Sequence, residues 1–83
     1  MPQATATYSD RFISDLKKLD RRQKILVFNR IEKIQSNPEL GKPLHAPLNG
    51  FRSERLECYR IIYKYSGSTV EFAWLQHRDE VYR

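Results

Sequence analysis

The hydrophobic pattern of this chain changes its period once, and that change limits the possible folds more than any other feature of the sequence. Before residue 41, apolar residues recur at helical spacing, first at Phe12, Ile13, Leu16 and Leu19 and then at Ile25, Val27, Phe28, Ile31 and Ile34. After residue 50 they alternate with polar residues. A helix repeats about every 3.6 residues and a strand about every two. The sequence therefore predicts helices in its first half and strands in its second.

Polar residues mark where the two predicted helices begin and end. Either Ser9 or Asp10 can cap the first helix and Asp20 the second, because their side chains accept hydrogen bonds from amides of the first turn. The second helix is expected to end at residues 36–38, Ser-Asn-Pro, because the residue before a proline is pushed out of the α conformation. Two amphipathic helices joined by a short turn predict an antiparallel pair laid on an apolar surface.

Strands are predicted on both sides of this helix pair. Alternation over residues 4–8 indicates a short first strand. Three later strands are predicted over residues 51–57, 59–65 and 69–75. Residues 41–50 read as a loop because of their prolines and glycines, and residues 66–68, Ser-Gly-Ser, as a tight hairpin turn. The order predicts one α+β domain over residues 1–83, with one helical layer on a sheet of about four strands.

The strand over residues 59–65 predicts that the two faces of the sheet differ. One face carries only tyrosine and isoleucine, whereas the other carries Arg60, Ile62 and Lys64. The first face is expected to lie under the helices and the second to carry charge. Trp74, among apolar neighbours in the last strand, is expected to belong to the core.

Composition narrows the class of partner. Fifteen lysines and arginines against ten aspartates and glutamates give a net charge of +5. This favours an acidic partner, such as nucleic acid, an anionic membrane surface or an acidic protein, although many small domains carry a few surplus lysines. The sequence has no secretory signal and no apolar run of the roughly 20 residues that a membrane helix needs. It therefore reads as a cytoplasmic protein that has no membrane contact.

Other chemistries lack the residues that they require. The single cysteine, Cys58, excludes an internal disulfide and a cysteine-based zinc site. The sequence contains no zinc-protease motif, no phosphate-binding glycine loop and no serine-nucleophile motif. We therefore expect no metal and no cofactor.

The groups best suited to binding a polyanion lie at residues 77–83, His-Arg-Asp-Glu-Val-Tyr-Arg, directly after the last predicted strand. Guanidinium groups bind phosphate through forked hydrogen bonds, and aromatic rings stack on bases. Tyr82 is suited to stack on a base or to orient a ribose hydroxyl. His77 could either transfer a proton near neutral pH or simply hydrogen-bond at the strand end.

Arg55 and Arg60 are expected to join this cluster. If the late strands are antiparallel neighbours, their arginines converge on one face and can form a cradle for phosphate. Each arginine alone could instead form a surface ion pair with an acidic neighbour. A nuclease built this way needs no metal, because the RNA's own 2′-hydroxyl can attack in line while guanidiniums stabilise the transition state.

Three blocks of the sequence resemble the RelE branch of the RelE/ParE toxin superfamily, over nearly the whole chain. They are Pro43-Leu44 with Leu48-Asn49-Gly50, then Arg55 with Tyr59-Arg60-Ile61-Ile62-Tyr63, and then residues 77–82. The resemblance implies two N-terminal helices packed on a mostly antiparallel sheet. It also implies the toxin of a toxin–antitoxin pair, which cleaves mRNA in the ribosomal A site by 2′-hydroxyl attack without a metal.

The resemblance also implies roles for individual residues. By position, Arg55 and Arg60 would hold phosphates, Arg78 would stabilise the transition state or assist the leaving group, and Tyr82 would position or stack on the RNA. Further RNA contacts are expected from Arg52, Lys64 and Arg83.

The sequence departs from the family at two places. Lysines, one of them a candidate base, precede the Tyr-Arg pair in the family, whereas residues 51–53 are Phe-Arg-Ser. Arginine stays protonated and is a poor base, so His77 becomes the candidate proton acceptor. The glycine common just before the Tyr-Arg pair is replaced by Glu57 or Cys58.

Two other functions stay open at this point. One is a ParE-like inhibitor that binds DNA gyrase, since that branch shares the scaffold. The other is a non-catalytic module that binds RNA or the ribosome. The expected partners are mRNA on the ribosome and a cognate antitoxin, which charge complementarity predicts to be acidic and partly disordered.

Overall fold

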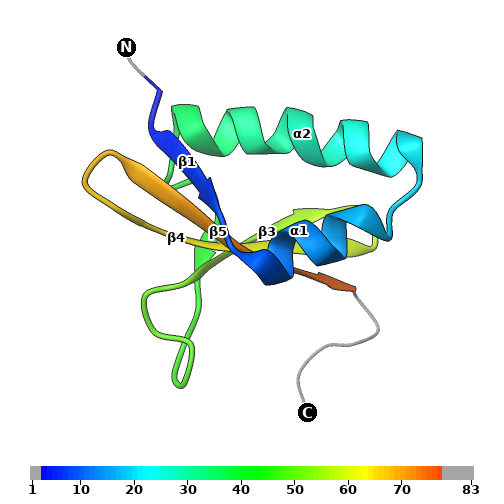
Figure 1. Cartoon of the computed structure of the whole chain (residues 1–83). Coiled ribbons are helices and arrows are strands. Elements are labelled where there is room, and N and C mark those ends of the chain that lie inside the picture. The colour runs from blue at the N-terminus through cyan, green and yellow to red at the C-terminus, as the bar shows by residue number, and fades with distance from the viewer. Residues whose placement is uncertain (1–2, 78–83) are drawn as a thin grey trace.

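The computed structural model describes residues 3–77 as two helices and five strands. The elements follow the chain as β1 (Thr5–Tyr8), α1 (Asp10–Lys17), α2 (Arg21–Ser36), β2 (Lys42–Pro43), β3 (Arg52–Leu56), β4 (Tyr59–Ser66) and β5 (Thr69–His77). Figure 1 shows this arrangement. The predicted α+β class and element order are confirmed. The sheet has five strands because Lys42–Pro43, inside the predicted loop, pairs with β3.

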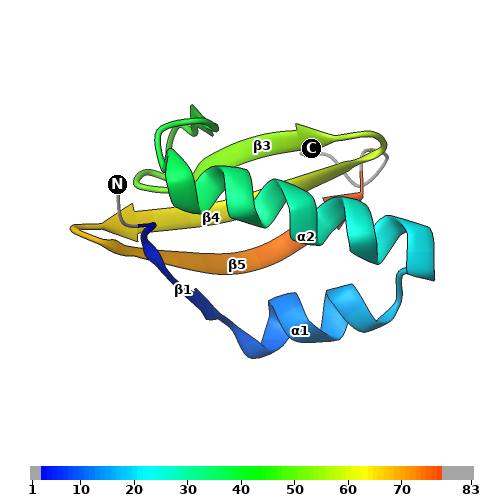
Figure 2. The same ribbon diagram turned by 90° about the horizontal axis from the view of Figure 1, so that it is seen from above.

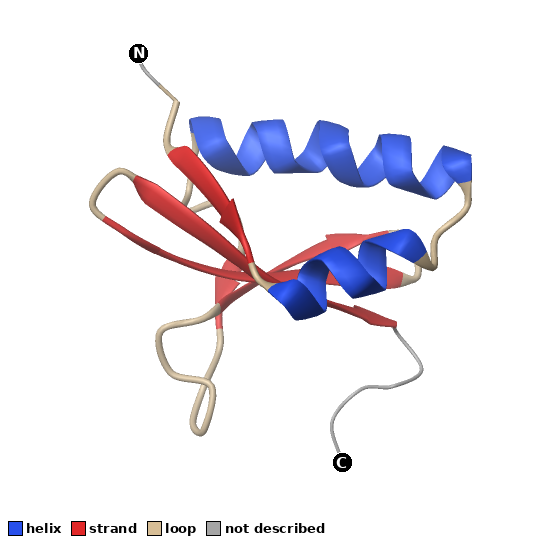
Figure 3. Ribbon diagram, in the orientation of Figure 1, coloured by secondary structure: helices blue, strands red, loops and turns tan. Residues whose placement is uncertain are grey.

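The strands form one mixed sheet in the order β1-β5-β4-β3-β2. The pairs β5–β4, β4–β3 and β3–β2 are antiparallel, whereas β1 runs parallel to β5. Both helices lie on the same side of this sheet, with α1 along β5 and α2 over β3 and β4 (Figures 2 and 3). The loop over residues 44–50 extends away from α2 (Figure 1).

Both helices begin at the predicted caps. Ser9 Oγ accepts a hydrogen bond from the amide of Phe12 at 3.0 Å. Asp20 forms a capping box with Gln23, in which each side chain accepts from the other residue's backbone amide. These reciprocal bonds satisfy amides that would otherwise have no partner in the first turn, so short polar side chains set where each helix starts.

The core lies between the helices and one face of the sheet. Its fully buried side chains include Phe12 from α1, Ile34 from α2, and Tyr63 and Phe72 from the central strands. The three aromatic rings lie close together, with centroids 5.6 Å apart for Phe12 and Phe72 and 6.0 Å for Tyr63 and Phe72. One cluster of rings therefore joins α1 to the centre of the sheet.

Tyr63 also anchors the segment that follows α2. Its buried hydroxyl accepts from the amide of Gly41 and donates to the carbonyl of Pro38, both at 2.8 Å. A Cβ on Gly41 would lie 2.8 Å from that hydroxyl and 3.0 Å from the carbonyl oxygen of Ser53. The close approach of the 38–41 segment to the sheet therefore requires glycine at this position. Burial raises the pKa of the Tyr63 phenol, so the protonated donor is the form that the fold favours.

A β-bulge in β5 changes which residues face the core. Ile62 lies opposite Trp74 and Tyr63 opposite Phe72, so Ala73 is the extra residue. The expectation that Trp74 belongs to the core is wrong, because the bulge turns this ring to the other face, where it is half-buried. Ser9 binds β5 at this point: its amide donates to Phe72 O at 3.0 Å and its hydroxyl donates to Ala73 O.

Candidate functional site

The face of the sheet opposite the helices carries three cross-strand rows of side chains. Residues directly opposite each other in neighbouring strands point to the same face. The rows run from β5 through β4 to β3 and consist of Gln76, Arg60 and Arg55, then Trp74, Ile62 and Ser53, and then Glu71, Lys64 and Phe51, which lies just before β3. No helix in the described part of the chain covers this face (Figure 3). We call it the open face.

The first row brings together the two arginines that were singled out from the sequence. Arg55 and Arg60 lie directly opposite each other in the β3–β4 pair, and Gln76 lies opposite Arg60 in β5. With Lys42 of β2, the two arginines line a pocket of about 500 Å³. The pocket therefore has three cationic side chains in its walls, which suits it to an anion.

The acidic residue in the wall of this pocket, Glu54, already forms an ion pair with an arginine of α2. Glu54 lines the pocket beside Arg55, and its carboxylate is bonded to the guanidinium of Arg30 on α2. Arg30 also donates to the backbone carbonyl of Arg55 at 3.1 Å. The Glu54 charge is thereby largely neutralised by Arg30 and attracts the arginine row less.

The second and third rows are more apolar. The Phe51 and Trp74 rings lie 5.5 Å apart between centroids, and Ile62 is fully buried beside them. Lys64 lies 5.3 Å from the Phe51 ring centroid and 3.4 Å from a carboxylate oxygen of Glu71. Lys64 therefore shares the open face with the arginines but is two rows away.

Arg52 is not part of the arginine row. It lies opposite Tyr63, on the helix side of the sheet, and donates to the carbonyl of Gly41 at 2.6 Å and to that of Glu39 at 3.3 Å. Its guanidinium lies 5.6 Å from the Tyr65 ring centroid. These contacts hold the segment after α2. The structure therefore gives Arg52 a role in the fold, in addition to the RNA contact that was predicted from the sequence.

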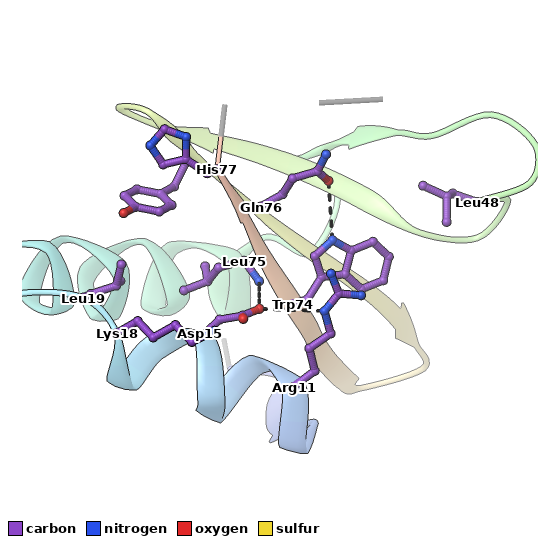
Figure 4. Close-up of a pocket in the computed structure, with 10 residues that line it drawn as sticks. Arg11, Asp15, Lys18, Leu19, Leu48, Trp74, Leu75, Gln76 and His77 are labelled. Carbon is purple, nitrogen blue, oxygen red and sulfur yellow. Dashed lines mark hydrogen bonds and ion pairs between the residues drawn. The ribbon is translucent and has the colours of Figure 1, made fainter. Parts of the chain in front are cut away.

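His77 lies on the opposite side of β5 from Gln76. Its ring meets the Tyr59 ring edge to face, with centroids 5.0 Å apart. Figure 4 shows His77 pointing away from Gln76 and Trp74. Arg55 and Arg60 are thus brought together by the sheet, whereas His77 stands at the strand end on the helix side. Arg78, Tyr82 and Arg83 lie outside the described residues.

A second and larger pocket, of about 720 Å³, lies where β5 extends beyond β1 (Figure 4). We call it the edge pocket. Its walls come from α1 and the two residues after it, from the start of β4, from the 44–50 loop and from the last residues of β5. They are formed by Arg11, Asp15, Lys18, Leu19, Leu48, Tyr59, Trp74, Leu75, Gln76 and His77.

Sequence reasoning missed several residues of these two pockets. Lys42 lay within a predicted loop, and Arg11 and Lys18 resembled the solvated face of a helix. Gln76 lay just past the predicted end of the last strand, and only the strand register places it beside Arg60. The signal that could have been used for Trp74 is the break in alternation at Phe72-Ala73-Trp74, where three apolar residues run together.

The turn before the Tyr-Arg pair explains one departure from the family pattern. Glu57 has a φ of +55°, a left-handed conformation that favours glycine. Its two carboxylate oxygens accept from Arg22 of α2 at 2.7 and 3.3 Å. This hydrogen bond and the charge of Glu57 raise the pKa of the Arg22 guanidinium. The residue that replaces the glycine thus ties the hairpin to the helix layer.

No described helix is long and apolar enough to cross a membrane. Between residues 3 and 77 there is no group of three or more histidine, cysteine, aspartate or glutamate side chains that could hold a metal ion.

Comparison with known protein families assigns the chain to one of them. The ParE toxin family, described as the ParE toxin of the type II toxin–antitoxin system parDE, matches residues 6–82. The chain belongs to this family. It is therefore a toxin of a toxin–antitoxin system, and its predicted place in the RelE/ParE superfamily is confirmed. A search of curated protein sequences finds no match.

Solved structures share the fold over nearly the full length of the chain. The toxin–antitoxin complex RelBE2 from Mycobacterium tuberculosis contains a chain that is 28% identical, with a TM-score of 0.85, covering 93% of this chain and 100% of that one. A chain of the intact Escherichia coli RelBE complex is 12% identical, with a TM-score of 0.78 and coverage of 96% and 99%. The YoeB dimer from Staphylococcus aureus contains a chain that is 20% identical, with a TM-score of 0.76, covering 92% of this chain and 98% of that one.

Proposed function

We propose that this toxin is an endoribonuclease that cleaves mRNA on the ribosome, in the A site, without a metal ion. The observation that carries the proposal is the row of Arg55 and Arg60 on the open face, with Lys42 at the same pocket. Three cations converge on a surface that no described helix covers, and this is the arrangement that binds a chain of phosphates.

The proposed chemistry uses the RNA's own nucleophile. The 2′-oxygen loses its proton and bonds to the neighbouring phosphorus, the bond from phosphorus to the 5′-oxygen breaks, and the 5′-oxygen takes up a proton from water. The other product is a 2′,3′-cyclic phosphate. Arg55 and Arg60 hold the phosphates and stabilise the negative charge that gathers on the non-bridging oxygens. Arg78 assists the leaving oxygen, and Tyr82 positions the RNA.

His77 is the proposed acceptor of the 2′-hydroxyl proton, because an arginine stays charged and does not act as a base at neutral pH. Its ring lies on the helix side of β5 and against Tyr59. The scissile phosphate must therefore lie at the end of the sheet, where both His77 and the arginine row are within reach. Lys64 and Arg83 extend the contact to neighbouring phosphates, whereas Arg52 lies on the helix side of the sheet.

Programmed ribosomes provide the direct test. Purified toxin is added to ribosomes that carry a defined mRNA, and the new 5′ ends are mapped by primer extension. Removing one charged donor from a transition state costs roughly 100- to 1,000-fold in rate, so Arg60→Ala and Arg78→Ala should each lose cleavage by that factor. Arg21→Ala, at an exposed arginine on α2, is the matched control and should cleave like the wild type.

The outcome that contradicts the proposal is an absence of A-site cleavage by the wild type. Cleavage that Arg60→Ala and Arg78→Ala leave unchanged contradicts the assigned roles. Salt-sensitive RNA binding with no cleavage under any condition would instead identify a non-catalytic module that binds RNA or the ribosome.

The proposed partner is a cognate antitoxin of acidic character. Solved structures with this fold include toxin–antitoxin complexes named RelBE and YoeB–YefM, and the net charge of +5 favours an acidic partner. Co-expression with the neighbouring small gene should yield a complex that co-purifies and does not cleave mRNA. A toxin that is harmless and soluble on its own would count against this partner.

The ParE description of the matching family favours one second candidate, inhibition of DNA gyrase. A gyrase inhibitor would stop supercoiling by purified gyrase and leave mRNA on ribosomes intact. A supercoiling assay run beside the ribosome assay therefore separates the two functions.

A further inference from the structure

The edge pocket is built around a tryptophan that the core does not use. The β-bulge at Ala73 turns Trp74 away from the helices, and its ring is half-buried on the wall of the pocket. The guanidinium of Arg11, from α1, lies 4.9 Å from the ring centroid. Arg11 is itself mostly exposed, with 67% of its side-chain area accessible. A planar ligand can therefore approach the indole by moving one exposed and flexible side chain.

One polar residue of the pocket, Gln76, also belongs to the arginine row and so connects the two sites. Gln76 lies one row from Trp74 on the same face, and its side-chain oxygen accepts from the indole nitrogen at 3.4 Å. In the other direction Gln76 lies opposite Arg60. Two residues along a strand span about 7 Å. A strand of RNA with a phosphate on the arginine row therefore has a neighbouring nucleotide within reach of Trp74.

The charge around the pocket suits an RNA strand. Arg11 and Lys18 are its cations, and Asp15 is its only carboxylate among the described residues. Asp15 is already engaged: one of its carboxylate oxygens accepts from the amide of Leu75 at 3.1 Å and lies 4.0 Å from Arg11 Nε. A phosphodiester backbone would thus meet two cations and a carboxylate that already has two partners.

The edge of β5 does not suit an added peptide strand. A peptide that extends a sheet needs free amides and carbonyls along the edge strand. The carbonyls of Phe72 and Ala73 accept from Ser9, and the amide of Leu75 donates to Asp15. Ser9, the cap of α1, and the Asp15 side chain therefore occupy the edge groups at this point. What the pocket offers a ligand is a ring, an amide and cations.

We propose that the edge pocket is a subsite for one nucleobase of the RNA strand whose phosphates lie on the Arg55–Arg60 row, an inference that rests on the proposed RNA ligand. The base stacks on Trp74 and moves the Arg11 guanidinium aside, and the Gln76 amide hydrogen-bonds to the edge of the base. A volume of about 720 Å³ is within the range of small-molecule sites.

Trp74 is the only tryptophan in the chain, so its fluorescence reports on this pocket directly. The full-length protein is titrated with two short single-stranded RNAs of equal length and charge, an oligouridylate and its abasic counterpart. The oligouridylate should quench the fluorescence and bind roughly 5- to 100-fold more tightly, which is the contribution of one stacked base. The abasic RNA should bind through its phosphates and leave the emission nearly unchanged.

Variants assign this preference to the pocket. Trp74→Leu, with binding followed by a dye on the RNA, should bind both RNAs equally, whereas Trp74→Phe, which keeps an aromatic face, should retain most of the preference. Gln76→Ala should reduce the preference while leaving Trp74 in place. Phe28→Leu, at an exposed aromatic residue on α2, is the control and should retain the full preference. Arg60→Ala should weaken both RNAs by the same factor.

Equal affinity of the wild type for the two RNAs would overturn the proposal, as would a preference that Trp74→Leu retains. Quenching by an acidic peptide but not by RNA would overturn it in favour of a protein ligand. These measurements use no ribosome, so their failure is separable from failure of the proposed nuclease. A base preference without A-site cleavage contradicts only the proposed nuclease activity. Cleavage without a base preference contradicts only the proposed subsite.

Discussion

Strands β3, β4 and β5 contribute side chains to both faces of the sheet, and the two faces differ in the contacts that these side chains make. On the helix face, Phe72 and Tyr63 are fully buried, and the Tyr63 hydroxyl both donates and accepts a hydrogen bond. On the open face, Arg55 and Arg60 stand directly opposite each other with the same charge. Packing on the first face stabilises the fold, whereas the second places two like charges side by side.

This difference predicts which substitutions should change stability and which should change RNA binding. Changes on the helix face should lower stability, whatever they do to activity. Changes on the open face should alter RNA binding and leave stability nearly constant, or even raise it. The following comparisons of substitutions on the two faces test this division.

The largest expected effect is at Phe72. Phe72→Ala removes a fully buried ring from the aromatic cluster and should lower the free energy of unfolding by about 3–5 kcal/mol. Trp74→Ala, two residues away in the same strand but on the open face, should lower it by much less, because that ring is half-buried. Urea unfolding of the two variants measures the difference. Equal losses would refute the division of the faces at the bulge.

The next effect is at Tyr63. Tyr63→Phe leaves the amide of Gly41 and the carbonyl of Pro38 without their partner and should cost about 1–3 kcal/mol. Tyr8→Phe, at an exposed ring, is the matched control and should cost almost nothing. The measurement is again urea unfolding near neutral pH.

Tyr63 should also make stability depend on alkaline pH. Burial raises the pKa of its phenol above the ordinary value of 10.0. The contribution is therefore fully present below about pH 10, where both states are protonated. As pH rises further, the unfolded state loses its proton first, so stability falls until the folded-state pKa is passed. The fall in stability above pH 10 should be shallower in Tyr63→Phe, and an identical fall would contradict the assignment.

A smaller effect is expected at Ser9, which joins α1 to the bulge. Ser9→Ala removes the cap of α1 and the hydrogen bond to the carbonyl of Ala73. It should cost about 0.5–2 kcal/mol, whereas Ser9→Asp, which caps but does not donate, should recover part of the loss. Thermal unfolding compares the three proteins. A Ser9→Ala protein as stable as the wild type would show that the bulge is held by other contacts.

The smallest effect, and the one with the opposite sign, is at Arg55. Arg55→Thr removes one of two like charges that face each other across β3 and β4 and places a good strand former there. Stability should rise by about 0.2–1 kcal/mol while RNA affinity falls. Salt titration provides the check, since added salt should reduce the gain in stability by screening the repulsion in the wild type. A loss of stability would mean that Arg55 contributes to the fold.

Sequence reasoning reached the parts of the fold that local chemistry determines. The caps at Ser9 and Asp20 and the end of α2 before Pro38 follow from hydrogen bonding and sterics within a few residues. The opposition of Arg55 and Arg60 follows from antiparallel pairing across a short turn. Each of these features depends only on neighbouring residues, which is why the pattern alone predicts it.

The parts it missed depend on residues distant in sequence. The two-residue strand β2 has too few residues to show a pattern. Trp74 changes face because of one extra residue, and the run of three apolar residues at 72–74 is a weak local signal of it. The edge pocket needs α1, the 44–50 loop and the end of β5 to meet. Such long-range pairing is set by the whole fold, and no window of the sequence contains it.

The parallel pairing of β1 with β5 has a consequence for how the toxin is made. β5 lies between β1 and β4 in the sheet, yet it is synthesised after every other described element. Until it emerges, β1 has no partner and the arginine row has no third strand. The open face, which needs β3, β4 and β5 side by side, can therefore form only after β5 has been synthesised. The fold thus makes the complete arginine row depend on the last strand of the described chain.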